Sequence, residues 1–118
     1  MTSQPSGCTI EEHRIDGVVV LVVSGTVDAI TAPQLDAAIA AAAAAAPAAI
    51  VVDLGAVDFL ASAGMGVLVA AHADLSPQMR LAVVADGPAT SRPLKLIGIA
   101  EILGVFARLD EALLAVSD

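Results

Sequence analysis

The stretch VVVLVVSG, residues 18–25, is an unbroken, largely β-branched run that follows one glycine and ends at another. Such a run predicts a strand buried on both faces. AIVVDLG, residues 49–55, predicts a second buried strand. The alanine-rich residues between them predict a helix that Thr31 caps and Pro47 ends. Two buried strands joined by one helix form a βαβ unit, so we expect these strands to be parallel.

The rest of the chain extends this unit in both directions. We expect further strands at 9–14, 80–86 and 105–109, a loop at 56–62, helices at 63–75 and 93–99, and a last helix capped by Asp110. The sequence therefore predicts a single α/β domain over residues 9–118, after a flexible tail at 1–8. Its sheet is mixed or mostly parallel, with about four or five strands packed by about four helices.

Composition excludes several classes of function. The 118 residues fit one domain, and the net charge of −8 repels phosphate backbones, so no nucleic acid is expected as a partner. Only 2% of residues are aromatic, with no Trp or Tyr, so base-stacking platforms are excluded. Cys8, His13 and His72 are the only soft ligands, so we expect no metal and no cofactor.

The sequence also predicts where the protein works. The longest apolar run, residues 37–52, is rich in alanine and broken by Pro47, so no membrane span and no membrane partner are expected. The N-terminus lacks the basic and apolar regions of a signal peptide. The single cysteine suits a reducing compartment. We therefore expect a cytoplasmic protein.

No motif of catalysis is present. Neither histidine has a recognisable partner, and the sequence contains neither a GxSxG elbow nor a phosphate-binding GxxxxGK[ST] loop. Gly64 and Gly66 form a lone GxG, which is too weak for a dinucleotide site. Asp53 and Asp58 fit loop caps or solvent-facing carboxylates better than acid–base catalysts. We expect no catalytic residues and no enzymatic activity.

Ser62 lies where a loop is expected to become a helix. Its simplest role is an N-cap, which stabilises a helix by about 1 kcal/mol. Gly64 and Gly66 are poor helix formers, so the first turn either packs closely against a neighbour or stays flat for a partner. A phosphoryl group on Ser62 would lie at a helix N-terminus, where negative charge is favoured. Its charge of about −2 would disrupt an apolar or acidic interface.

Two motifs resemble the STAS domain of bacterial anti-anti-sigma factors. GTVD at 25–28 resembles the family's G-x-[IVL]-D segment. DLGAVDFLASAGMG at 53–66 resembles its D-L-x-x-[VL]-x-[FY]-[LMI]-D-S-[ST]-G-[LM]-G stretch, and residues 92–113 resemble its closing helix, strand and helix. The likeness spans residues 9–116 and is carried by both motifs together.

The resemblance implies a partner switch in sigma factor regulation. The domain binds an anti-sigma factor, usually a serine kinase with the histidine-kinase-like ATPase fold, and thereby frees a sigma factor. The kinase then phosphorylates the first serine of the motif, here Ser62, which releases the complex, and a cognate phosphatase resets it. The resemblance assigns partner binding to the following residues: Asp28, Ser62, Gly64, Met65 and Gly66.

The chain departs from the family pattern at two positions. Ala61 replaces the family's Asp and Ala63 replaces its second hydroxyl residue, so Ser62 is the only acceptor in the motif. Ser62 as a plain N-cap in a module that is never phosphorylated stays an alternative, as does Asp28 as a simple loop cap. Residues 90–92, Thr-Ser-Arg, either rim the same surface or start a helix.

Two other functions remain open. A STAS domain also serves as an accessory subunit of a transporter or as part of a stress-signalling scaffold, binding its partner without phosphorylation. A small ligand-binding or enzymatic α/β domain would need a pocket with converging polar groups. The partner recovered with the chain distinguishes these alternatives.

Overall fold

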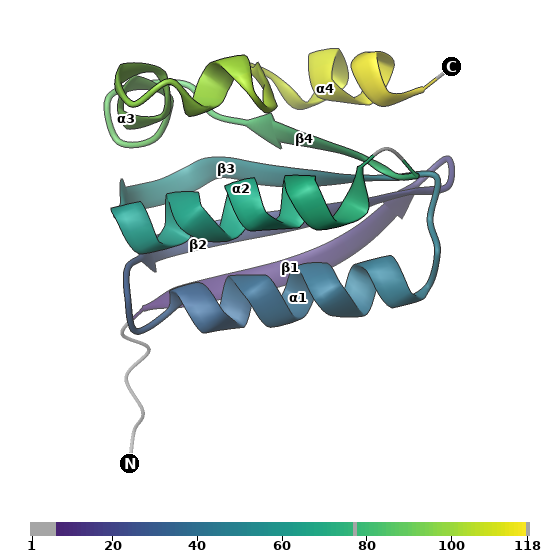
Figure 1. The fold of residues 1–118 in the computed structure, drawn as a ribbon, viewed down its shortest axis with the longest axis horizontal. Helices are drawn as coiled ribbons and strands as arrows, with labels where there is room; N and C mark the ends of the chain where they lie inside the picture. Colours follow the sequence, from purple (N-terminus) through teal and green to yellow (C-terminus); the bar gives the residue numbers. More distant parts are fainter. Residues whose placement is uncertain (1–6, 77, 118) are drawn as a thin grey trace.

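One five-stranded sheet organises the molecule (Figure 1). The computed structural model describes residues 7–76 and 78–117. The strands lie in the order of the sequence: β1 (Cys8–Ile15), β2 (Val18–Val27), β3 (Ala49–Leu60), β4 (Arg80–Val84) and β5 (Gly104–Phe106). β1 is antiparallel to β2, and the other neighbours are parallel. The predicted mixed, mostly parallel sheet is confirmed.

Helices cover both faces of this sheet. They are α1 (Ala32–Ala44), α2 (Ser62–Leu75), α3 (Ser91–Leu96) and α4 (Leu109–Val116), with a 3₁₀ turn, η1 (Ile99–Glu101), after α3. α1 and α2 lie side by side (Figure 1) and pack on one face. α4 packs on the other face. The single α/β domain with four α-helices is therefore confirmed.

Strand β2 shows why apolar and polar residues do not alternate along the buried strands. Val19, Leu21 and Val23 belong to the core beneath α1 and α2. Val18 and Val20 belong to the core beneath α4. Because successive side chains of a strand point to opposite faces, a strand covered on both sides needs apolar residues throughout.

The predicted loop at 56–62 is wrong, because β3 continues to Leu60. Its last residues pair with the end of β2, Thr26 with Phe59 and Val27 with Leu60, after register shifts in the ladder. The shifts admit Gly55 and keep both strands paired. This longer strand moves the start of the next helix and fixes where Ser62 lies.

Of the three predicted caps, one holds its predicted position and two lie at other residues. Thr31 holds the cap position of α1 without a capping hydrogen bond, since its hydroxyl serves the preceding loop. Ala61 holds the cap position of α2 without a capping side chain, so Ser62 is the first residue of the helix. α4 follows Arg108, so Asp110 lies inside its first turn. The two caps that differ do so by one and two residues, the range within which the ends of a helix vary.

The ends of the elements show two further details. α1 ends before Pro47, as expected, with Ala46 in the left-handed region at a φ of 54°. Most of the tail expected at 1–8 lies outside the described residues, but Cys8 is the first residue of β1. Among the residues that the structure describes, no helix is long and apolar enough to cross a membrane.

Candidate functional site

The ends of three parallel strands meet at one edge of the sheet. Parallel strands end at the same edge, so the segments after β2, β3 and β4 lie together at the left of Figure 1. They contain Asp28, Ser62 and residues 86–91. Ligand and partner sites of open α/β sheets are commonly found outside the carboxyl ends of the strands.

A hydrogen bond joins the start of α2 to the end of β2. The amide of Ala61 donates to the carbonyl of Val27 over 2.8 Å. Val27 also pairs with Leu60 in the ladder. Asp28 and Ser62, the residues that follow, therefore start from neighbouring points of the backbone. The structure brings these two predicted residues to the same edge.

Asp28 caps its own loop. Its Oδ1 accepts hydrogen bonds from the amides of Ile30 (3.0 Å) and Thr31 (3.1 Å). The Thr31 hydroxyl accepts from the Asp28 amide and donates to the Thr26 carbonyl, each over 2.9 Å. The amide of Thr31, followed by that of Ile30, holds the pKa of the Asp28 carboxyl below its usual range against a smaller opposing effect of burial. The loop is thus fixed with the carboxylate charged.

Ser62 is the exposed first residue of α2. The amides of Gly64 and Met65 donate to the carbonyl of Ala61, over 3.0 and 3.2 Å. The hydroxyl of Ser62 forms no hydrogen bond with any residue that the structure describes. The Ser62 side chain therefore does not stabilise the helix by a hydrogen bond. It lies at the positive end of the dipole of α2.

The two glycines of the motif serve different purposes. A Cβ at Gly64 would lie 2.5 Å from Cγ1 of Val27 and 2.9 Å from Cδ1 of Leu60, so close packing excludes a side chain there. A Cβ at Gly66 would meet nothing within 4 Å. Gly66 is exposed, and its lack of a side chain leaves the outer surface of α2 flat.

The five predicted partner-binding residues differ in exposure. Ser62 and Gly66 are exposed, and Asp28 is half-buried. Gly64 and Met65 are buried, so any influence of these two on a partner passes through the position of α2. Direct contact is open to the first three only.

Two apolar residues at this edge were missed by the sequence reasoning. Ile30, in the loop after β2, is 86% exposed, and Phe59, near the end of β3, is 55% exposed. Exposed large apolar side chains mark interaction surfaces when they gather. The available signals were an isoleucine in the short loop between Asp28 and Thr31 and one of only two phenylalanines in the chain.

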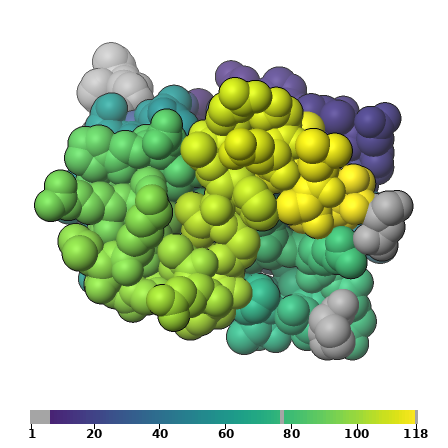
Figure 2. Space-filling view, turned by 90° about the horizontal axis from the view of Figure 1, so that it is seen from above, coloured from purple at the N-terminus to yellow at the C-terminus, as the bar shows by residue number. Residues whose placement is uncertain are grey.

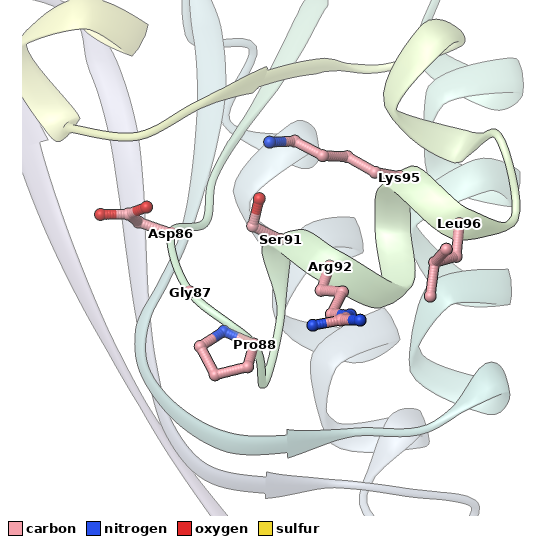
Figure 3. A pocket seen from close by; sticks show the side chains of 7 residues that line it. All are labelled: Asp86, Gly87, Pro88, Ser91, Arg92, Lys95 and Leu96. Atoms are coloured by element: carbon pink, nitrogen blue, oxygen red, sulfur yellow. The ribbon is translucent and has the colours of Figure 1, made fainter.

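The loop after β4 leads into a shallow hollow. Thr90 takes the cap position of α3, and Ser91 and Arg92 form its first turn, so the helix-start alternative holds. Thr90 and Ser91 are buried, whereas Arg92 is exposed. Arg92 lines a hollow of about 660 Å³ together with the residues labelled in Figure 3: Asp86, Gly87, Pro88, Ser91, Lys95 and Leu96.

The remaining candidates lie in ordinary places. His13 is exposed on the edge strand β1, 3.5 Å from Glu11, and His72 lies near the end of α2. Asp53 accepts a hydrogen bond from the amide of Gly55 over 2.9 Å, as a loop cap does. Asp58 is exposed. Within the described residues, no three His, Cys, Asp or Glu side chains gather as metal ligands.

Known proteins resemble this chain over most of its length. A family model of the STAS domain matches residues 9–112. The chain is 38% identical over 114 residues to the anti-sigma-F factor antagonist RsfB of Mycobacterium tuberculosis, covering 97% of this chain and 93% of that protein.

Solved structures agree. An anti-sigma factor antagonist from Mycobacterium paratuberculosis is 44% identical, with a TM-score of 0.92 over 99% of this chain and 100% of that one. The Bacillus cell fate determinant SpoIIAA in its phosphorylated form, 20% identical over 92% of this chain and 100% of that one, has the same fold with a TM-score of 0.68. Since one family model covers most of the chain and relatives match nearly its full length, the chain belongs to the STAS-domain family of anti-sigma factor antagonists.

Proposed function

We propose that this protein binds an anti-sigma factor that is also a serine kinase of the histidine-kinase-like ATPase fold, and so releases a sigma factor. Phosphorylation of Ser62 ends the complex, and a phosphatase restores it. The protein acts by binding rather than by catalysis, in the cytoplasm, where bacterial transcription takes place. The names of RsfB and of the Mycobacterium paratuberculosis protein support the role of antagonist.

The exposed, unbonded hydroxyl of Ser62 carries the proposal. A kinase can reach it, and no hydrogen bond within the described residues has to break. At the start of α2 a phosphate would be tolerated by the fold. The same charge of about −2 would lie close in sequence to exposed Phe59, where a partner in apolar contact would lose affinity.

The contact surface follows from the same edge. We assign it to the Asp28 loop, Ser62 and the flat face at Gly66, with Ile30 and Phe59 as apolar anchors. Gly64 and Met65 support it from beneath. Moving a partner from mostly bound to mostly free takes about a 10⁴-fold change in affinity. A phosphate supplies more of that change than a single carboxylate.

The first experiment is a pull-down from the native cytosol with wild type and Ser62→Glu, identified by mass spectrometry. We expect an anti-sigma kinase with wild type and its loss with Ser62→Glu. Ser76→Glu is the matched control, because Ser76 is exposed at the other end of α2. A membrane transporter in place of the kinase would favour the accessory-subunit alternative.

A phosphorylation assay separates the switch from the binding. The purified kinase and ATP should place phosphate on wild type, and Ser62→Ala should remain unmodified by mass spectrometry. If the kinase binds both serine variants as tightly as wild type, the antagonist role stands without the Ser62 switch. Ala61 and Ala63, the departures from the family motif, would then be the first residues to restore.

A further inference from the structure

An apolar and basic surface lies at α3, beyond the site described above. We name it the α3 patch; it consists of Arg92, Lys95, Leu96, Ile97 and Ile102. The exposed fractions of Leu96, Ile97 and Ile102 are 75%, 56% and 53%. Figure 2 shows this part of the chain, in green, forming a continuous face beside α4 in yellow. Three of the seven exposed large apolar side chains of the described residues thus fall within seven positions.

The charge of this segment differs from that of the rest. Residues 86–102 hold two cations, Arg92 and Lys95, and two carboxylates, Asp86 and Glu101. The remainder of the chain holds three cations and eleven carboxylates. An acidic partner is therefore repelled by most of the molecule and least at the α3 patch.

Both cations are available to such a partner. Neither side chain makes a hydrogen bond or ion pair with any residue that the structure describes. Both line the shallow hollow of Figure 3, where Lys95 and Arg92 point to different sides of α3. The carboxylate of Asp86 lies across the hollow and points away from the helix in this view. A segment lying over α3 can thus meet one cation on each side.

Ser91 adds a hydroxyl that opens on the hollow. Its residue is only 7% exposed, it lines the same hollow, and its hydroxyl forms no hydrogen bond with any described residue. No buried side-chain oxygen or nitrogen of the described residues lacks a hydrogen-bond partner, so this hydroxyl reaches the solvent of the hollow. A carboxylate or carbonyl oxygen of a bound segment would accept a hydrogen bond from the Ser91 hydroxyl.

We infer that the α3 patch is a second contact surface for the anti-sigma factor, and that it takes an apolar segment of that protein flanked by carboxylates. This rests on the proposed function. The patch follows β4 at the edge where the Ser62 surface follows β3, so one partner can cover both. Interfaces combine an apolar centre with arginine and a charged rim that steers encounter.

The test measures the dissociation constant of the purified anti-sigma factor at low and high salt. Arg92→Glu and Lys95→Glu should each weaken binding about tenfold at low salt, and less at high salt. Arg14→Glu changes net charge equally on the exposed edge strand β1 and should have less than about a twofold effect. Leu96→Ser should weaken binding, whereas Leu114→Ser, at a residue of matched exposure on α4, should not.

The outcomes separate this inference from the proposed function. If Ser62→Glu abolishes binding while the α3 variants behave as their controls do, the α3 patch is overturned and the proposed function stands. If wild type binds no anti-sigma factor, both the proposed function and the inference about the α3 patch are wrong. If sedimentation shows that Leu96→Ser dissociates a dimer of this chain, the patch joins two copies and the inference is wrong. Restoration of Lys95→Glu binding by an acid-to-lysine change in the partner would support the pairing directly.

Discussion

The amide of Ala61 donates to the carbonyl of Val27 over 2.8 Å, and this bond places the start of α2 against the end of β2. The approach is so close that a Cβ at Gly64 would lie 2.5 Å from Cγ1 of Val27. The glycine in the motif is thus required by packing. The position of Ser62 on the surface depends on that packing.

Gly64→Ala should destabilise the domain. Overpacking costs about 1–3 kcal/mol, and the better helix propensity of alanine offsets about 1 kcal/mol. Val27 is fully buried and β-branched, so its methyl group cannot rotate away cheaply. Urea unfolding measures the change, and the loss should shrink in a Val27→Ala background. Equal stability of Gly64→Ala and wild type would contradict the close packing.

Gly66→Ala is the matched opposite case. The new Cβ meets nothing within 4 Å and sits in an exposed helix, so the variant should gain about 0.5–1 kcal/mol. Thermal unfolding measures this gain. Under the proposed function it should also weaken anti-sigma factor binding, since the flat face is lost. A stabilised variant with unchanged affinity would remove Gly66 from the contact surface.

Ala61→Asp should stabilise α2. Ala61 holds the cap position with extended backbone, a φ of −87° and a ψ of 169°, and lacks a capping side chain. An aspartate there accepts a first-turn amide and favours the helix dipole, a gain of about 1 kcal/mol. Ala70→Asp, on the exposed middle of the same helix, should instead be destabilising. Thermal unfolding of both variants measures the two stability changes. Equal changes for Ala61→Asp and Ala70→Asp would mean that Ala61 is not the cap.

The sequence predicted the βαβ unit and showed the two family motifs because both depend on local patterns. Continuous apolar runs and glycines predicted the strands and the first helix. The resemblance of two spaced motifs singled out Asp28 and Ser62, which the structure brings to one edge. The cap of α2 was missed by one residue because β3, paired with β2 through register shifts, continues to Leu60. A register shift depends on pairing between distant residues, which a single sequence does not display.

The sequence did not predict which large apolar side chains are exposed, for a related reason. Ile30, Phe59 and Leu96 have the same composition signal as core residues, and only the tertiary structure shows which side chains stay outside. The roles of Gly64 and Gly66 were likewise left as two alternatives. The structure shows close packing at Gly64 and open space at Gly66.

Asp28 should make stability depend on pH. Hydrogen bonds, first from the amide of Thr31, depress the pKa of its carboxyl in the folded state. The stabilisation is therefore complete above the unfolded value of about 3.9 and is lost as pH falls through the folded pKa. Urea unfolding between pH 7 and about pH 2.5 should show the gap between wild type and Asp28→Asn closing only at acid pH. Parallel curves would show that the carboxylate charge adds nothing.

Cys8 should react slowly in the native protein. Its thiol donates to Oε1 of Gln34 over 3.4 Å, and burial, the largest influence, raises the pKa of the thiol. Since the thiolate is the nucleophile, a raised pKa lowers the reactive fraction near neutral pH. Alkylation of the native chain should be slower than that of the same chain in urea, where the pKa is about 8.5. The native rate should keep rising above the pH at which the unfolded rate levels off. A native rate equal to or above the unfolded one would instead show a stabilised thiolate in β1.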